Sequence, residues 1–321
     1  MNNILDTIGN TPIVKVNKII ESTDFDLYLK LEGFNPSGST KDRSALSIMK
    51  NALQSGKITK DSVIIESSSG NFGIALAQIC CYMQLPFICV VDEHITSMNY
   101  KLLQVYNAQI YYISSKDLEE GESLLQKRVS TVKKLLKEIP NSFNPNQYEN
   151  LYNPYGHRQT MEEIQKELGK VDYVFCAVST FGTIRGYAEY IKENNLKTKI
   201  IAVDAVGSVI FGGKPKKRLL PGHGAARRSE LFVEDMVDDV VYVSDLECTR
   251  SCRRLLNMEG ILSGASTGGI ITAIIKYQEK IEKNSVCVAI MHDRGERYLN
   301  TIYSDEWVEK NFGINKKELG V

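Results

Sequence analysis

Lys41 is the residue of this sequence best suited to covalent chemistry. It follows a turn-forming stretch, residues 35–40 (NPSGST), and opens a segment with a helical pattern of apolar residues. A lysine that projects from such a helix start into a cleft loses hydration and meets other positive charge, and both effects lower its pKa and make the amine nucleophilic. An isolated lysine of this kind is more often a solvated side chain beside a helix cap, so the neighbouring motifs must decide between the two interpretations.

Three further loops place small and hydroxyl-bearing residues between an apolar strand and a helix. They cover residues 66–73 (ESSSGNFG), 179–183 (STFGT) and 262–269 (LSGASTGG). Hydroxyl groups and free backbone amides at a helix start bind carboxylate or phosphate, and Asn71 adds a directional amide. In the last loop, one of the serines could place its hydroxyl on a ring nitrogen while the glycines let a flat ligand lie close. A helix cap or a simple turn is the alternative for each loop taken alone.

The charge balance of the chain argues for a small-molecule substrate. Lys plus Arg and Asp plus Glu each number 39 in 321 residues, so we expect neither nucleic acid nor a membrane as a partner. No run of about 18 apolar residues occurs, and residues 1–12 lack the pattern of a secretion signal. Seven scattered cysteines predict reduced, buried thiols and a cytoplasmic location. Cys248 and Cys252 have helical spacing but no accompanying ligands within a short span, so we predict no metal site.

Short β-branched runs alternate with helical patterns along the chain, which is typical of βαβ units and predicts an α/β fold with mostly parallel sheets. The predicted strands are 26–32, 62–66, 86–92, 108–114, 173–179, 199–205, 240–244 and 286–291. The predicted helices are 43–54, 72–83, 98–106, 119–137, 156–168, 182–193, 245–258 and 267–280. Parallel strands place the loops that follow them at one edge of a sheet, where the four motifs can meet.

Two stretches interrupt this alternation. Residues 139–150 contain two prolines and four asparagines and predict a domain boundary. Two domains are the natural expectation for 321 residues, with a long single-core barrel as the alternative. Residues 207–228 are rich in glycine and basic side chains and form either a long surface loop or a functional lid. Within this loop Arg227 follows a tight Gly222-His223-Gly224 turn and is the best candidate to point inward, whereas Lys214 to Arg218 are equally well explained as solvated.

Taken together and in order, the four loops resemble those of the cysteine synthase and cystathionine β-synthase family of fold type II pyridoxal-phosphate enzymes. The resemblance runs from IGNTP at 8–12 to DRGERYL at 293–299. It implies two three-layer α/β/α domains with mostly parallel sheets. The large cofactor-binding domain would comprise residues 1–38 and 146–321, and the small mobile domain, residues 39–145, would close over the substrate. We also expect a homodimer.

The resemblance assigns a role to each motif. Lys41 would hold pyridoxal 5'-phosphate through a Schiff base and act as the catalytic amine. The other cofactor contacts would be Asn71 on the 3-hydroxyl, Ser179, Thr180, Phe181, Gly182 and Thr183 on the phosphate, and Ser266 on the pyridine nitrogen. The substrate contacts would be Ser68, Ser69, Gly70, Gln147, Tyr148, Arg128 and Arg227. A solvated helix face is the alternative for Arg128, and a packed core tyrosine for Tyr148.

Two departures from the family pattern bear on the substrates. The phosphate loop of the family usually reads Gly-Thr-Gly-Gly-Thr, and here Ser179 and Phe181 replace glycines, which we expect to add bulk on the substrate side of the cofactor. Residues 203–212 and 220–227 resemble the siderophore-pathway branch that joins O-phospho-L-serine to L-glutamate, giving N-(2-amino-2-carboxyethyl)-L-glutamate, a 2,3-diaminopropionate precursor. This implies a β-replacement synthase that works through an aminoacrylate. The alternatives are a cysteine synthase that uses sulfide, a cysteine β-lyase or β-replacement enzyme that releases hydrogen sulfide, and a non-catalytic binding protein.

Overall fold

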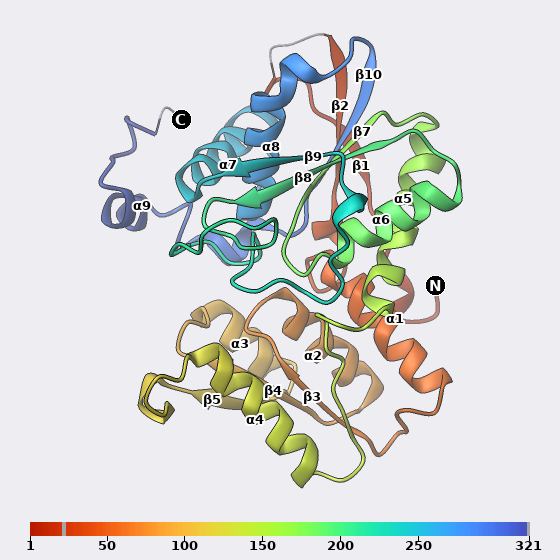
Figure 1. The fold of residues 1–321 in the computed structure, drawn as a ribbon, viewed down its shortest axis with the longest axis vertical. Helices are drawn as coiled ribbons and strands as arrows, with labels where there is room; N and C mark the ends of the chain where they lie inside the picture. The colour runs from red at the N-terminus through yellow and green to blue at the C-terminus, as the bar shows by residue number, and fades with distance from the viewer. Residues whose placement is uncertain (21–23, 320–321) are drawn as a thin grey trace.

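Two mostly parallel sheets organise the chain in the computed structural model, which describes residues 1–20 and 24–319 (Figure 1). The larger sheet has the order β1-β2-β10-β7-β8-β9. Its strands are β1 (Ile13–Lys15), β2 (Phe25–Lys30), β10 (Ser285–Ile290), β7 (Tyr173–Ala177), β8 (Lys199–Ala205) and β9 (Asp239–Val243). Among the pairings of these described strands, only that of β1 with β2 is antiparallel. The predicted α/β class with mostly parallel sheets is confirmed.

The smaller sheet is parallel throughout and has the order β5-β4-β3-β6. Its strands are β3 (Val63–Ser67), β4 (Phe87–Asp92), β5 (Gln109–Ile113) and β6 (Ser142–Phe143). All six residues of β4 are buried, as expected for an apolar strand in the interior of a parallel sheet. The sequence predicts residues 139–150 to be irregular, and the short β6 lies within them.

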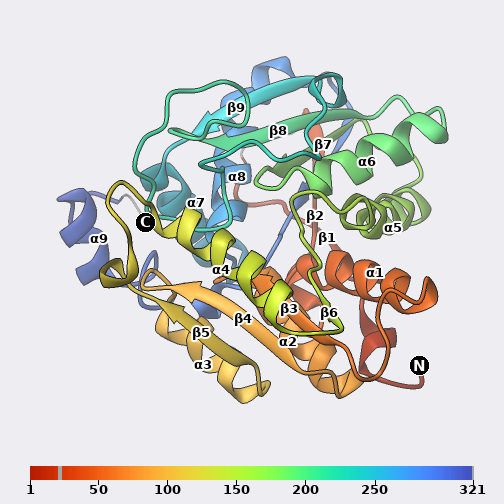
Figure 2. The ribbon, with the colours of Figure 1, turned by 60° about the horizontal axis from the view of Figure 1, so that its bottom comes forward.

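Helices cover both faces of each sheet. On the larger sheet, Figure 1 shows α5 (Tyr152–Leu168) and α6 (Gly182–Glu193) on one face and α7 (Asp245–Glu259) and α8 (Ala265–Tyr277) on the other. On the smaller sheet, Figure 2 shows α4 (Leu124–Glu138) on one face and α2 (Asn71–Met83) and α3 (Ser97–Val105) on the other. Helix α1 (Lys41–Gln54) packs against both α2 and α5, so it joins the two halves. Helix α9 (Asp305–Phe312) lies near the C-terminus.

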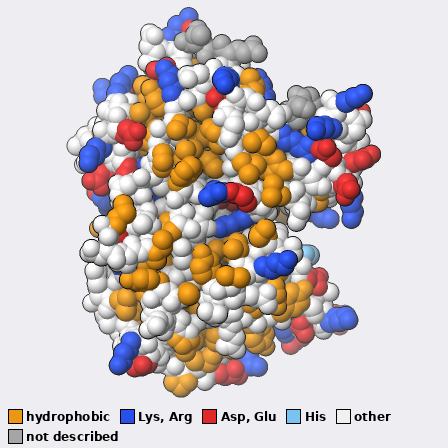
Figure 3. Space-filling view, turned by 180° about the vertical axis from the view of Figure 1, so that it is seen from behind, with side chains coloured by type: hydrophobic (Ala, Val, Ile, Leu, Met, Phe, Trp, Pro, Cys, Tyr) orange, Lys and Arg blue, Asp and Glu red, His pale blue; other side chains and the backbone are white. Residues whose placement is uncertain are grey.

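Short 3-10 helices complete the secondary structure; they are Ile4–Thr7, Glu32–Phe34, Ser115–Asp117, Glu234–Met236, Gln278–Lys280 and Gly295–Tyr298. None of the helices in the described part of the chain is long and apolar enough to cross a membrane. The surface seen from behind is hollowed at one side between the upper part, built on the larger sheet, and the lower part, built on the smaller one (Figure 3).

Most predicted elements occur within two residues of their expected bounds, and the exceptions are the starts of α4 and α5 and the end of α8, at Tyr277. Helix α4 begins at Leu124 and not at 119, because Ser123 and Gln126 form a capping box that starts the helix there. Helix α5 begins at Tyr152, four residues earlier than predicted. The sequence does not predict strand β1 or helix α9, since a three-residue edge strand and a two-turn helix carry little periodic signal.

A buried ion-pair network fixes α1 against the larger sheet. The guanidinium of Arg43 donates from Nε to Glu32 Oε2 at 2.6 Å and from Nη2 to Glu32 Oε1 at 2.7 Å. It also donates to both carboxylate oxygens of Glu163 on α5, at 2.8 and 2.7 Å. Lys30 on β2 reaches Glu163 at 2.6 Å, and Thr11 donates to Glu32 at 2.6 Å. Two cations and two carboxylates thus compensate one another in the interior, where an unpaired charge is costly.

We predict that Arg43→Met lowers the free energy of unfolding by about 3–5 kcal/mol, because it leaves Glu32 and Glu163 buried without their main partner. Urea unfolding of the purified protein measures this loss. Lys15→Met is the matched control, since it removes an ion pair with Asp26 in which both side chains are about half exposed. Equal unfolding midpoints for the two variants would contradict a stabilising role for the buried network.

Candidate active site

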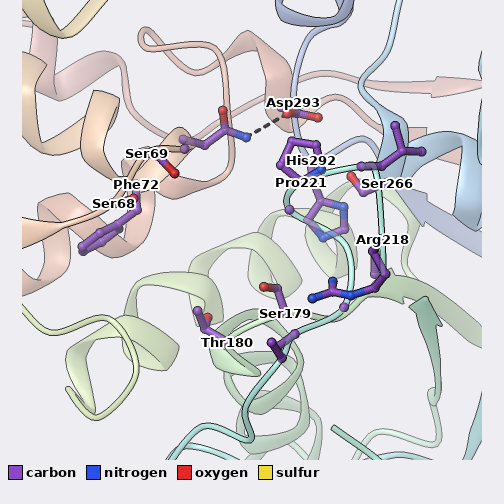
Figure 4. Close-up of a pocket in the computed structure, with 18 of the residues that line it drawn as sticks. Ser68, Ser69, Phe72, Ser179, Thr180, Arg218, Pro221, Ser266, His292 and Asp293 are labelled. Carbon is purple, nitrogen blue, oxygen red and sulfur yellow. Dashed lines mark hydrogen bonds between the residues drawn. The ribbon is translucent and has the colours of Figure 1, made fainter. Parts of the chain in front are cut away.

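A cavity of about 750 Å³ opens at the carboxyl ends of strands from both sheets. Four helices, α1, α2, α6 and α8, begin at or beside it, so their positive dipole ends converge there. The sequence-predicted residues that line it are Lys41, Ser68, Ser69, Gly70, Asn71, Arg128, Gln147, Tyr148, Ser179, Thr180, Phe181, Thr183, Arg227 and Ser266. Figure 4 shows several of these side chains around the same space. Gly182 starts α6 but is not among the lining residues.

Lys41 is the first residue of α1 and faces the cavity. Burial lowers the pKa of its amine to about 8, although nearby Cys176 and Asp293 act in the opposite direction. A fraction of this lysine is therefore uncharged near neutral pH, which is the form that attacks a carbonyl or accepts a proton.

Asn71 begins α2 and bonds to residues that follow β10. Its Nδ2 donates to Asp293 Oδ2 at 2.8 Å, while Arg297 donates to Asn71 Oδ1 and to the carbonyl of Ser37. Tyr298 donates to the same carboxylate oxygen of Asp293 at 2.7 Å. Asp293 Oδ1 is buried without a donor among the described residues, and burial raises the pKa of this carboxyl. The network connects the helix after β3 of the smaller sheet with the segment after β10 of the larger one.

The loop from Ser179 to Thr183 lies at the start of α6, where backbone amides and the helix dipole can hold an anion, and we call it the anion cradle. Ser179 is half-buried, and Thr180 and Thr183 are buried. Gly182 is required there, because a Cβ would overlap the side chain of Asn153. The hydroxyl of Thr183 lies 3.4 Å from Nε2 of buried His157, whose pKa burial holds well below its ordinary value. A neutral imidazole leaves the positive charge of the cradle to the helix dipole and the backbone amides.

Phe181 departs from its expected place. Its backbone is left-handed, with φ +67°, and its ring is 2% exposed. The ring packs against Phe232 and Phe211, with centroids 4.9 and 6.3 Å apart. The expectation that Phe181 adds bulk on the substrate side is therefore corrected: although the residue lines the cavity, most of its ring is taken up by this aromatic cluster, because the left-handed backbone turns the side chain into the core.

The loop 67–70 forms the wall of the cavity that belongs to the smaller sheet. Ser68 Oγ accepts the backbone N–H of Gly73 at 3.1 Å, and Asn99 donates to the carbonyl of Ser69 at 3.0 Å. Figure 4 shows Ser68 and Ser69 facing the same space as Ser179 and Thr180. Gln147 is buried and also lines this space. These groups can hold a carboxylate between the two sheets.

Two arginines from the sequence prediction lie at the cavity, each with a partner. Arg128 on α4 forms an ion pair with Asp92, with Nε and Oδ2 3.1 Å apart. The guanidinium of Arg227 lies over the ring of Tyr148, with its Cζ 4.2 Å from the ring centroid, and its buried Nε has no hydrogen-bond partner among the described residues. Burial raises the pKa of Tyr148, so the phenol stays protonated at neutral pH. Arg227 thus lines the cavity and keeps one donor without a partner among the described residues.

For Lys216, Lys217 and Arg218 the sequence leaves contact with substrate anions and a solvated loop equally open. All three line the cavity, and Arg218 donates to the carbonyl of His223 at 2.6 Å. Sequence reasoning missed other lining residues. The sequence does not single out Asp92 or the pair Asp293 and Arg297 either, although Asp293 and Arg297 lie within the quoted DRGERYL motif. Because this motif lies near the C-terminus, nothing in the sequence indicates that the chain folds back there to the start of α1.

The lining residues fit pyridoxal phosphate. An amine of lowered pKa, Lys41, suits its aldehyde, and the start of α6 with Thr180 and Thr183 suits its phosphate. Ser266, 4% exposed in the first turn of α8, lines the cavity with a hydroxyl that can meet a ring nitrogen. Gly264 before it has no room for a Cβ, which would overlap Asp293. The donor set therefore matches an aldehyde, a phosphate and an aromatic nitrogen in one ligand.

We predict that Lys41 reacts with small aldehydes faster than the exposed lysines of the chain when the protein is stripped of cofactor. The rate should rise with pH and level off above about pH 8, because the uncharged amine is already abundant there, whereas an ordinary lysine is still almost wholly protonated. Borohydride trapping and peptide mass mapping across about pH 6–10 would measure this. Labelling of Lys41 that is no faster than that of surface lysines at about pH 8 would contradict the lowered pKa.

Comparisons with known proteins agree with this site. Residues 4–293 match the family model of pyridoxal-phosphate dependent enzymes. A hydrogen sulfide-producing enzyme from Fusobacterium nucleatum is 33% identical with a TM-score of 0.87, covering 93% of this chain and 98% of that one. An O-acetylserine dependent cystathionine β-synthase from Helicobacter pylori is 30% identical with a TM-score of 0.86 and covers 95% and 99%.

A cysteine synthase from Entamoeba histolytica is similar to the same degree, with 32% identity, a TM-score of 0.88 and coverage of 94% of this chain and 90% of that one. The fold, the lining of the cavity and the family match all lead to the same assignment. The chain belongs to the family of pyridoxal-phosphate dependent enzymes, among its members of the cysteine synthase and cystathionine β-synthase type.

Proposed function

We propose that this enzyme replaces the β-substituent of O-phospho-L-serine with the amino group of L-glutamate, giving N-(2-amino-2-carboxyethyl)-L-glutamate and phosphate. The observation that carries the proposal is the excess of positive charge around the cavity. Besides Lys41, the lysines and arginines that line it in the described part of the chain are Arg128, Lys216, Lys217, Arg218, Arg227 and Arg297, and the carboxylates are Asp92 and Asp293. Such a lining favours a dianionic leaving group and an acceptor with two carboxylates.

Each part of the proposed reaction has a residue suited to it. Bound pyridoxal phosphate supplies an electron sink for the charge left when a proton leaves the α-carbon. Lys41, which would hold the cofactor, would also be the amine that removes the α-proton and later returns it. Ser68, Ser69 and Gln147 hold the α-carboxylate, which keeps the α-proton in front of Lys41.

The basic loop 216–218 suits the leaving phosphate, and Arg227 suits an acceptor carboxylate. Arg218 and Ser179 reach into one part of the cavity in Figure 4. The Nε of Arg227, buried beside Tyr148 without a partner among the described residues, gains a hydrogen bond when an anion binds. Charge-assisted hydrogen bonds of this kind contribute about 1.5–3 kcal/mol each. Arg128 is a weaker candidate, because Asp92 already compensates its charge.

The second candidate function is β-replacement or β-elimination with sulfur compounds, and the similarity to a hydrogen sulfide-producing enzyme favours it. Both functions share the cofactor and differ in the donor and the acceptor. Mass spectrometry of the products formed from O-phosphoserine with glutamate, and from O-acetylserine or O-phosphoserine with sulfide, separates them. Faster turnover of O-acetylserine with sulfide would give first place to the cysteine synthase function.

We predict that Arg227→Ala raises the KM for O-phosphoserine or glutamate about tenfold or more, since it removes a charge-assisted hydrogen bond, and leaves the visible absorbance of the cofactor unchanged. Arg228→Ala is the matched control. Arg228 is the next residue, but it is exposed, donates from Nε to the carbonyl of Ile210 at 2.8 Å and does not line the cavity. Steady-state kinetics with both substrates measure the effect. Equal KM values for the two variants would exclude Arg227 as a substrate contact.

We further propose that residues 39–145 form a smaller domain that closes over the substrate, while 1–38 and 146–321 form the larger, cofactor-binding one. The division of the sheets and the location of Ser68 and Ser69 opposite Ser179 and Thr180 support this. Closure would exclude water from the reaction. Small-angle scattering should then give a smaller radius of gyration with O-phosphoserine than without it, and equal radii would count against closure.

The proposal extends to a homodimer in the cytoplasm. Exposed Leu151, Tyr152 and Tyr155, at the start of α5, provide apolar surface that a second copy of the chain can cover.

A further inference from the structure

Glu66 is a buried carboxylate just behind the substrate wall of the cavity. It lies near the end of β3, is 6% exposed and does not line the cavity itself. The residues that follow it, Ser68 to Asn71, do line the cavity. A carboxylate is rarely buried in this way without partners that compensate its charge. Its partners therefore indicate what it holds in place.

Amide groups from two separate segments surround this carboxylate. The backbone N–H of Ser67 donates to Glu66 Oε1 at 2.8 Å. The backbone amides of Asn146 and Gln147 and the side-chain amide of Asn144 act on the same carboxylate and lower its pKa, although burial raises that pKa overall to about 7. Oε2 is buried without a well-aligned donor of its own among the described residues, so the charge depends on these amides together.

The course of the chain explains why a side chain has to join these segments. Backbone pairing between β3 and β6 is limited to Val63 with Ser142 and Ile64 with Phe143. Beyond it, Asn144 donates to the carbonyl of Ile65 at 2.6 Å, and Asn146 turns with a left-handed backbone of φ +44°. From this point the segment 144–148 leaves the sheet and brings Gln147 and Tyr148 to the cavity. The Glu66 carboxylate thus contacts this segment just beyond the last backbone pair of β3 and β6.

We propose that Glu66 is a positioning residue that clamps the loop 67–70 to the segment 144–148, so that both contact the α-carboxylate of the amino-acid donor together. The proposal rests on the proposed function, which places Ser68, Ser69 and Gln147 on that carboxylate. Glu66 does not touch the substrate. It sets the spacing between two walls that must bind the α-carboxylate at once, so a displaced wall weakens binding of the donor.

The test compares Glu66→Gln with Glu93→Gln. The first variant keeps the shape of the side chain but replaces one accepting oxygen with an amide nitrogen, which cannot accept a backbone N–H. Glu93 follows the neighbouring strand β4 and also accepts a backbone N–H, that of Ser115 at 3.0 Å, but it is exposed and does not line the cavity. Both variants thus lose a carboxylate that holds a loop at the end of a strand.

We expect Glu66→Gln to raise the KM for the amino-acid donor about tenfold or more, with kcat changed less than about threefold, while Glu93→Gln behaves like the wild type. Amide hydrogen exchange of residues 144–148 in the substrate-free protein should become faster in Glu66→Gln alone, because its amides lose their acceptor. The cofactor absorbance should stay as in the wild type. An unchanged KM, or a raised KM with unchanged exchange in 144–148, would overturn the proposal.

Two further cases, an inactive wild type and a Glu66→Gln variant that does not fold, each have their own test. If the wild type turns over no serine-derived donor, the proposed function fails, and amide exchange alone then decides whether the clamp exists. If Glu66→Gln does not fold, Glu66→Asp replaces it, since this variant keeps the charge but reaches about one methylene less far. A KM and exchange rates in Glu66→Asp equal to those of the wild type would then overturn the clamp, and a rise in both would support it.

Discussion

The guanidinium of Arg43 is held on two sides by the buried carboxylates of Glu32 and Glu163, and Lys41 lies only two residues away on the same helix. Because the N–H donors of a planar guanidinium meet the oxygens of both carboxylates in a fixed geometry, the helix cannot rotate without losing several bonds at once. Burying these charges costs desolvation free energy, so the network specifies a location for α1 more than it adds stability. The direction of the Lys41 amine follows from that location.

A second consequence concerns charge inside the cavity. Four helices begin at or beside it, and their dipoles favour anions there. Burial disfavours the ammonium form of Lys41 in the same cavity. Asp293 and Cys176 oppose this effect, and Asp293 is itself restrained by Asn71 and Tyr298. The pKa of about 8 is therefore a balance between burial, which lowers it, and Cys176 and Asp293, which raise it.

The sequence predicted the α/β class and the loops at the ends of the strands, because both depend on short-range patterns. Apolar runs such as β7 and β8 and the small-residue loops at 66–73 and 179–183 are visible in any window of about ten residues. Contacts between distant segments were not predictable in the same way. The bond between Asn71 and Asp293 spans 222 positions, and the ion pair of Arg128 with Asp92 depends on how α4 packs on β4. Neither contact can be inferred from the periodicity of apolar residues in the sequence.

Phe181 shows how the anion cradle and the basic loop depend on one another. A left-handed backbone costs a bulky residue roughly 1–2 kcal/mol, which is why glycine usually occupies such a position. Here the ring gains contacts with Phe211, which belongs to the loop 207–228, and with Phe232 just beyond that loop. The aromatic cluster offsets the backbone cost and anchors both ends of the segment that carries Lys216 to Arg218 and Arg227. A glycine at 181 would remove the backbone strain but also the aromatic contacts that hold the loop 207–228. Phe181, which departs from the family pattern, thus connects the anion cradle to the basic side chains of the cavity.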